Sequence, residues 1–173
     1  VIKWLSVFCL ALAPLVYIVL QAAADALGAE PAKALVEYLG GVAIIFLFFT
    51  LALTPIRKLP RVGRKFVVVL RFRRMLGLFV FFYASLHVLS YGLLLVDWQN
   101  FVEDFYKRLY ITMGLVAYII LMMMAITSPK VMVKKLGRKW KSLHRLVYVA
   151  GVFVVIHVWW QLRADYGEAL LYA

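Results

Sequence analysis

Five long apolar segments constrain the fold of this chain more than any other feature. One of them contains LFVFFYASLHVLSYGLLL, residues 78–95, eighteen residues without a charged side chain. The hydrocarbon core of a bilayer is about 30 Å thick, and a helix needs roughly 20 mainly apolar residues to cross it. The segments lie at about residues 4–21, 38–53, 75–95, 109–126 and 143–162. Since 66% of the 173 residues are hydrophobic, against about 45–50% in soluble domains, we predict an all-α polytopic membrane protein.

The predicted architecture is a helical bundle of five spans in one domain over residues 1–173. Apolar character returns near residue 170, where a sixth span is expected to begin or to be truncated. The first segment has features of a signal peptide, a basic start at Lys3 and the small-residue stretch QAAADA. Its apolar run is longer than the 7–15 residues typical of a signal peptide, so we interpret it as the first span.

Charge predicts the orientation of the spans. The net charge is +12, and 15 of the 20 basic residues lie in residues 57–74 and 130–145, which contain no acid. All eight acidic residues fall on the opposite side of the predicted topology. The positive-inside rule therefore places the N-terminus in the cytoplasm. The basic segments are interpreted as topology signals beside anionic membrane lipid, with no nucleic-acid partner.

Three histidines are the candidate functional residues. His87 follows Met75 by 12 residues and His157 follows Leu143 by 14, so both lie about 18–21 Å into the membrane at 1.5 Å per residue. Two imidazoles at matched depth on different helices are what a bis-histidine haem b requires. The third, His144, lies at the inner edge of the last span, about 140° around a straight helix from His157. Neighbouring aromatic residues could wall such a ring: Phe82, Tyr83, Phe153 and Trp160.

Other interpretations of these histidines remain open. A single intramembrane histidine often makes only a helix–helix hydrogen bond. A proton relay is another possibility, although relays usually include buried acids and the spans contain none. The one cysteine, Cys9, excludes an internal disulfide and the C-x-x-C-H motif, so a haem here would not be covalently attached.

Several motifs resemble a known family. The stretches RRMLGL, LHVLSY, KLGRKWKSLHRLVY and IHVWW are similar to the ferric-reductase-like transmembrane family, and most of all to its MsrQ/YedZ branch of haem-binding membrane subunits. The resemblance implies a six-helix bundle with b-type haem, one or two per chain. His87 and His157 match the outer ligand pair of the family, and His144 matches one inner ligand. The fourth ligand position holds Arg73, so an inner haem would lack one histidine, and Arg73 or Arg74 would instead pair with haem propionates.

The resemblance also implies a function. MsrQ-like proteins pass electrons from membrane quinol, or from a cytosolic flavin reductase, to a periplasmic molybdenum-containing methionine sulfoxide reductase that repairs oxidised proteins. The resemblance also implies that FMN could associate with the protein. The chain has no G-x-G-x-x-G or G-x-x-x-x-G-K motif, so the electrons are expected to come from a partner or from the quinone pool. We therefore predict an electron-transfer subunit without catalytic residues of its own.

Two alternatives stay open from the sequence. The first is a stand-alone transmembrane ferric or quinone reductase. The second is a haem-free transporter or structural membrane protein in which the histidines only pack.

Overall fold

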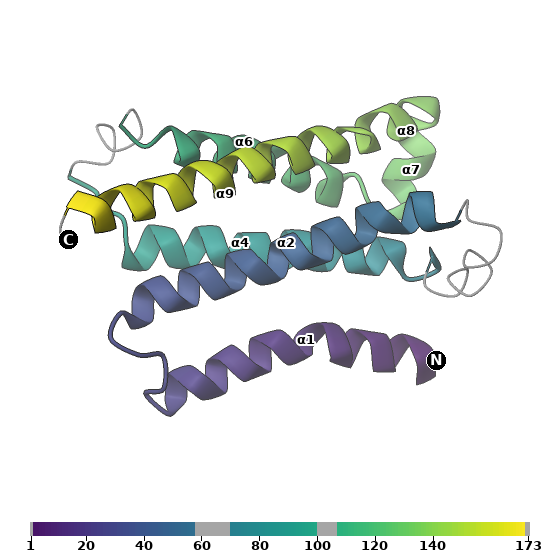
Figure 1. Cartoon of the computed structure of the whole chain (residues 1–173). Coiled ribbons are helices and arrows are strands. Elements are labelled where there is room, and N and C mark those ends of the chain that lie inside the picture. The colour runs from purple at the N-terminus through teal and green to yellow at the C-terminus, as the bar shows by residue number, and fades with distance from the viewer. Residues whose placement is uncertain (1, 58–69, 100–106, 172–173) are drawn as a thin grey trace. The chain divides into compact units, whose positions relative to one another are not determined.

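The computed structural model describes residues 2–57, 70–99 and 107–171. Within these ranges every regular element is a helix (Figure 1): α1 (Ile2–Ala23), α2 (Pro31–Arg57), α4 (Arg73–Leu94), α6 (Leu109–Ile126), α7 (Lys130–Leu136), α8 (Arg138–His144) and α9 (Leu146–Leu171). The chain divides into two compact units, Val1–Val96 and Asp97–Ala173. The all-helical prediction is confirmed. Much of the predicted basic segment 57–74 and part of the acidic loop near residue 100 lie outside the described residues.

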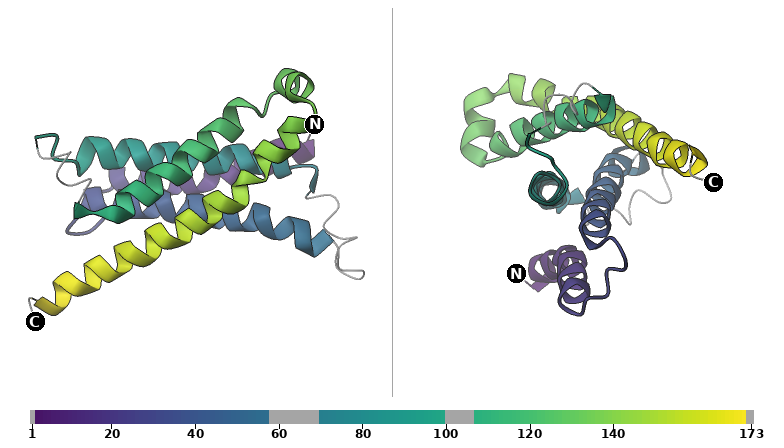
Figure 2. Two further views of the ribbon diagram at one scale, coloured as in Figure 1. Left: turned by 90° about the horizontal axis from the view of Figure 1, so that it is seen from above. Right: turned by 90° about the vertical axis from the view of Figure 1, so that its left-hand side faces the viewer.

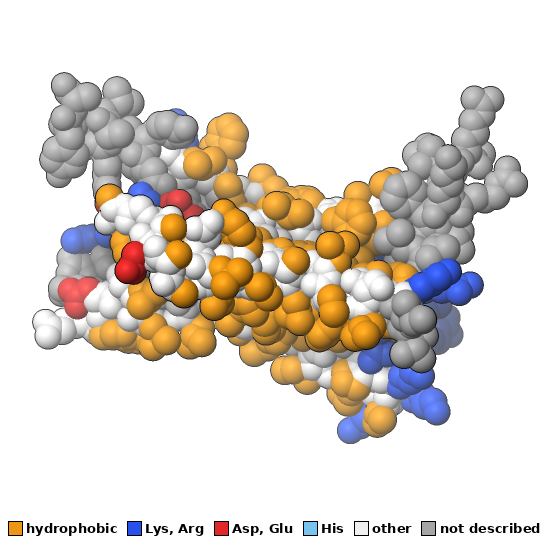
Figure 3. Space-filling model, turned by 90° about the horizontal axis from the view of Figure 1, so that it is seen from below, with side chains coloured by type: hydrophobic (Ala, Val, Ile, Leu, Met, Phe, Trp, Pro, Cys, Tyr) orange, Lys and Arg blue, Asp and Glu red, His pale blue; other side chains and the backbone are white. Residues whose placement is uncertain are grey.

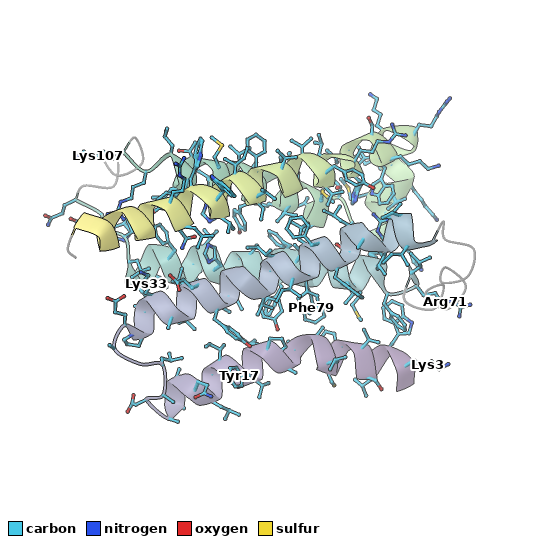
Figure 4. The ribbon with its side chains drawn as sticks, viewed as in Figure 1. Lys3, Tyr17, Lys33, Arg71, Phe79 and Lys107 are labelled. Carbon is cyan, nitrogen blue, oxygen red and sulfur yellow. The ribbon has the colours of Figure 1, made fainter. Side chains whose placement is uncertain are left out.

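The first unit is built from α1, α2 and α4. Helices α2 and α4 pack along each other, as the views in Figures 1 and 2 show, and α1 lies against this pair. Its core joins one apolar stripe from each helix: Ala11 and Ile18 from α1, Leu39, Val42 and Ala43 from α2, and Phe79 and Tyr83 from α4. Figure 4 shows Phe79 directed toward α1, where its ring centroid lies 5.4 Å from that of Phe8.

Two tyrosine hydroxyls attach α1 to its neighbours near a proline. Pro14 lies inside α1 and has no N–H, which removes one hydrogen bond from the helix. The hydroxyl of Tyr83 donates to the carbonyl of Ala11 at 2.7 Å, and the hydroxyl of Tyr38 donates to the carbonyl of Pro14 at 3.2 Å. Tyr83 is one of the residues predicted to wall a haem. In the structure this α4 residue is completely buried, and its hydroxyl and ring pack against α1.

Helix α2 is longer than the predicted span 38–53. It begins at Pro31 and continues through Pro55 to Arg57. Proline suits the first position of a helix because that residue needs no N–H partner. The additional turns at the start of α2 contain Lys33 and Glu37, whose charged groups are 4.0 Å apart. A search for uncharged segments ends before these turns, because both residues are charged.

The second unit is built around α6 and α9, which pack along each other (Figure 2). Its buried apolar residues come from both helices: Ala117, Ile120 and Leu121 from α6, and Val147 and Ala150 from α9. In the sequence, α6 and α9 are connected by the short basic helices α7 and α8. These two helices are separated by Gly137, whose φ of 51° favours glycine. Helix α9 continues to Leu171, so the predicted start of a sixth span near residue 170 coincides with its end.

Five segments of the described chain are long and apolar enough to cross a membrane: Lys3–Ala23, Pro31–Ile56, Arg73–Leu94, Leu109–Ile126 and Arg138–Arg163. Large apolar side chains are exposed along these helices, and Figure 3 shows hydrophobic side chains covering the middle of the face that it displays. Such a surface is compatible with lipid contact and unusual for a soluble monomer. The protein is therefore a multi-pass membrane protein, as predicted.

Candidate functional site

His87 is oriented by the backbone of α2. Its Nδ1 lies 2.8 Å from the carbonyl oxygen of Val36, and the residue is half-buried at about two thirds of the length of α4. A carbonyl oxygen only accepts hydrogen bonds, so Nδ1 carries the hydrogen and donates it. In a neutral imidazole the lone pair then belongs to Nε2, the nitrogen that is suited to bind a metal.

Gly40 provides the space that this contact needs. It follows Val36 by one helical turn on the same face of α2. A Cβ built on Gly40 would lie 2.9 Å from Nδ1 and 3.0 Å from Cε1 of His87. Any other residue at this position would therefore press on the imidazole.

His157 has the same surroundings in the second unit. Its Nδ1 lies 2.7 Å from the carbonyl oxygen of Tyr110, and Gly114 follows Tyr110 by one turn of α6. A Cβ on Gly114 would lie 2.8 Å from Nδ1 and 3.0 Å from Cε1 of His157. The same tautomer follows, with the hydrogen on Nδ1 and the lone pair on Nε2.

The two glycines lie in matching stretches of sequence, which the sequence analysis did not identify. Residues 40–47 read GGVAIIFL and residues 114–121 read GLVAYIIL, with Gly, Val, Ala, Ile and Leu in common. The histidines also match, as LHV and IHV. In both units the residue seven positions before the histidine is buried, Val80 in one and Ala150 in the other. The repeated pattern G-x-V-A-x-I-x-L is the signal from which the glycines could have been found.

His144 has different surroundings. Its Nε2 lies 3.2 Å from the hydroxyl oxygen of Thr127, and that hydroxyl lies 2.7 Å from the carbonyl of Met123. The single hydroxyl hydrogen goes to the carbonyl, which only accepts, so Nε2 of His144 donates to Thr127. The ring also stacks on Trp140 at 4.0 Å between centroids, and the indole N–H of Trp140 donates to the carbonyl of Thr127 at 3.0 Å. His144 thus has the opposite tautomer to the other two histidines.

The remaining predicted site residues lie apart from His87. Arg73 and Arg74 are exposed in the first turn of α4, 14 and 13 residues before His87, which corresponds to about 20 Å along the helix. Within the described residues no three His, Cys, Asp or Glu side chains form a group that could hold a metal ion by themselves. A group with ligands of its own, such as a porphyrin, needs only one or two protein ligands.

Comparison with known proteins gives a consistent answer. The family model described as ferric reductase like transmembrane component matches residues 39–160. A protein of Xanthomonas euvesicatoria named protein-methionine-sulfoxide reductase heme-binding subunit MsrQ is 45% identical over 157 residues, 88% of this chain and 69% of the relative. The protein of the same name from Ralstonia nicotianae is 40% identical over 176 residues, 98% of this chain and 78% of the relative. No solved structure matches the chain.

The family match begins at residue 39 in α2 and ends at residue 160 in α9, so it includes all three histidines. The two relatives match 88% and 98% of this chain. The resemblance noted in the sequence is confirmed. The chain belongs to the ferric-reductase-like transmembrane family, among the MsrQ proteins.

Proposed function

We propose that this protein is a b-type cytochrome subunit of the bacterial inner membrane. It passes electrons from quinol, or from a cytosolic flavin reductase, to a periplasmic molybdenum-dependent methionine sulfoxide reductase. The imidazoles of His87 and His157 would hold the iron of its haem. The protein holds and orients the redox group, and a partner subunit carries out the chemistry on the substrate.

The equivalent environment of His87 and His157 is the observation that carries this proposal. Histidines that bind a metal almost always donate their second ring N–H to a carbonyl, carboxylate or water, which fixes the tautomer and raises the basicity of the ligating nitrogen. His87 and His157 both do so, at 2.8 Å and 2.7 Å. Both contacts put the hydrogen on Nδ1 and the lone pair on Nε2. Helix packing alone does not require the same tautomer in both histidines.

The residues of this chain would favour electron transfer over substrate chemistry. When bound, haem supplies a one-electron couple whose potential depends on its axial ligands and their hydrogen bonds. With His87 and His157 both holding the iron, the haem would carry electrons rather than bind a substrate. The carbonyls of Val36 and Tyr110 hold the imidazoles in place, so these two side chains would need little rearrangement during electron transfer.

The names of the relatives support the partner. They are described as heme-binding subunits of a protein-methionine-sulfoxide reductase, and a catalytic subunit of that activity is the partner we assign to this chain. The charge distribution supports an N-terminus in the cytoplasm, because the basic helices α7 and α8 would then lie on the cytoplasmic side. Neither the described residues nor the relatives' names support FMN binding.

An inner haem on His144, with Arg73 or Arg74 at its propionates, is the second arrangement that the family pattern suggests. It predicts two haems per wild-type chain and one in His144→Ala. The hydrogen bond from His144 Nε2 to Thr127 favours the single-haem arrangement, because that nitrogen would have to lose its hydrogen and its partner before it could bind iron.

The test is the reduced-minus-oxidised visible spectrum of the purified protein, with haem counted per chain. We expect a low-spin b-type signal that is lost in His87→Ala and in His157→Ala and retained, at least for one haem, in His144→Ala. Wild-type haem content in all three variants, or a colourless wild type with full helical content, would show that the proposal is wrong.

A second experiment distinguishes the subunit from a stand-alone reductase. Dithionite-reduced protein is mixed with a ferric chelate alone, and separately with the periplasmic catalytic subunit and methionine sulfoxide. The proposal expects fast reoxidation only in the presence of the catalytic subunit. Equally fast reoxidation by the chelate alone would favour the ferric reductase.

A further inference from the structure

We propose that Gly40 and Gly114 are positioning residues for the two axial histidines. Each glycine leaves open the backbone carbonyl that orients its histidine. This inference rests on the proposed function, because it concerns how His87 and His157 are held as ligands. It adds two residues that do not contact the haem iron and act only through the imidazoles.

The geometry of a helix explains why glycine is needed at these two positions. The carbonyl of residue i points along the helix toward residue i+4, whose N–H it binds. A carbonyl oxygen has two lone pairs, so the carbonyls of Val36 and Tyr110 can accept a second hydrogen bond from an imidazole. A side chain at i+4 lies beside that second acceptor direction. With glycine there, the ring of His87 approaches to 2.8 Å, and the ring of His157 to 2.7 Å.

The space left by each missing Cβ is filled by the histidine ring itself. The nearest atoms to a Cβ on Gly40 are all from His87, at 2.9, 3.0 and 3.6 Å, and those nearest Gly114 are all from His157, at 2.8, 3.0 and 3.4 Å. Contacts below 3.0 Å require something to move. The imidazole is held by the backbone on one side, so a methyl group at either position would rotate or displace the ring and lengthen the Nδ1 hydrogen bond.

Loss of that hydrogen bond would change the electronic properties of the ligand. Donation from Nδ1–H gives the imidazole more anionic character and makes Nε2 a stronger donor to iron. A stronger donor stabilises the oxidised metal, so the bond lowers the reduction potential. We therefore expect Gly40→Ala and Gly114→Ala each to raise the midpoint potential of any haem they retain, and to weaken haem binding roughly 10–100-fold.

The first unit contains matched controls for Gly40→Ala, in the helices of Gly40 and His87. Gly41 lies next to Gly40 in α2, and Gly77 lies in α4, the helix of His87. A Cβ on either one meets no atom within 4 Å. Gly41→Ala and Gly77→Ala change the same kind of residue in the same helices, and they should keep wild-type haem affinity, potential and ferric EPR g values. The two test variants should shift all three.

A second measurement is independent of haem and guards against misfolding. Thermal unfolding is followed for the apoprotein of wild type, Gly40→Ala, His87→Ala and the double variant. Alanine normally stabilises a helix interior relative to glycine. Gly40→Ala should therefore lower the unfolding midpoint when His87 is present and raise it when His87→Ala has removed the ring. The pair Gly114→Ala and His157→Ala should behave in the same way.

The outcomes separate this inference from the proposed function. If His87→Ala and His157→Ala lose haem while both glycine variants match Gly41→Ala in affinity, potential and EPR, the positioning role is wrong and the ligand assignment stands. An unchanged effect of Gly40→Ala on stability in the His87→Ala background would also overturn the positioning role. If the histidine variants keep wild-type haem, the proposed function is wrong and the positioning role falls with it.

Discussion

The imidazole Nδ1 of His157 lies 2.7 Å from the carbonyl oxygen of Tyr110, 47 residues earlier in the chain. The acceptor belongs to the backbone, so the identity of the Tyr110 side chain is secondary to the position of α6 beside α9. The same relationship joins His87 to Val36. In both units the orientation of the histidine thus depends on the path of a neighbouring helix and not on a neighbouring side chain.

Substitution of Tyr110 by phenylalanine should leave haem binding unchanged. The ring of Tyr110 lies 5.9 Å from that of His157, and phenylalanine keeps both this ring and the backbone carbonyl. Haem content and midpoint potential of Tyr110→Phe are the quantities to measure. Haem loss comparable to that of His157→Ala would mean that the phenol hydroxyl of Tyr110, and not its backbone carbonyl, determines the orientation of the His157 imidazole.

Thr127→Val should separate the role of His144 from that of the other histidines. Valine keeps the shape of threonine and removes the hydroxyl that accepts from His144 at 3.2 Å. We expect a loss of stability of about 0.6 kcal/mol and at most about 1.7 kcal/mol, the average and the largest value measured for hydrogen bonds between helices of a membrane protein, and no change in the haem that we propose His87 and His157 to hold. Denaturation in detergent and the haem count are the measurements, and a loss of haem in Thr127→Val would instead favour an inner haem near His144.

Tyr83→Phe should weaken the attachment of α1 more than Tyr38→Phe does. The Tyr83 hydroxyl is completely buried and donates to Ala11 at 2.7 Å, whereas the Tyr38 bond is longer, 3.2 Å, and only partly buried. We expect Tyr83→Phe to cost about 1–2 kcal/mol, near the upper end for such bonds, and Tyr38→Phe about 0.5 kcal/mol. Unfolding of the two variants in the same detergent gives the comparison, and the reverse order would contradict the assigned geometry.

Truncation of two leucines should distinguish helix packing from lipid contact. Leu47 of α2 is 2% exposed and Leu20 of α1 is 64% exposed. Leu47→Ala leaves a cavity between helices and should cost about 2–5 kcal/mol. Leu20→Ala exchanges one lipid contact for another and should be nearly neutral, since lipid tails are as apolar as leucine. The free energy of unfolding measures both, and similar losses would show that α1 packs more extensively than described.

Labelling of single cysteines should establish the orientation in the membrane. In a Cys9→Ser background, Lys33→Cys places a thiol at the start of α2, and Lys139→Cys places one in α8. With the N-terminus in the cytoplasm, a membrane-impermeant maleimide added to spheroplasts should label Lys33→Cys and should label Lys139→Cys only after permeabilisation. The opposite pattern would reverse the predicted topology.

The sequence by itself determined the properties that depend on run length and composition. The positions of the five spans follow from the number of apolar residues needed to cross a bilayer, and the three histidines stand out because polar residues are rare in such runs. A similar depth for His87 and His157 could be predicted by counting residues along their spans. The full length of α2 was not predicted, because Lys33 and Glu37 interrupt the apolar run at the start of the helix.

Only the tertiary structure showed how each histidine is held. The contacts of His87 and His157 reach back 51 and 47 residues, to backbone atoms that have no sequence signature. The importance of Gly40 and Gly114 arises from a Cβ that is missing beside a ring of another helix. The tautomer of His144 depends on where the single hydrogen of Thr127 goes. Local patterns report which residues enter the membrane, whereas the proton position on an imidazole depends on the partner that packing brings to it.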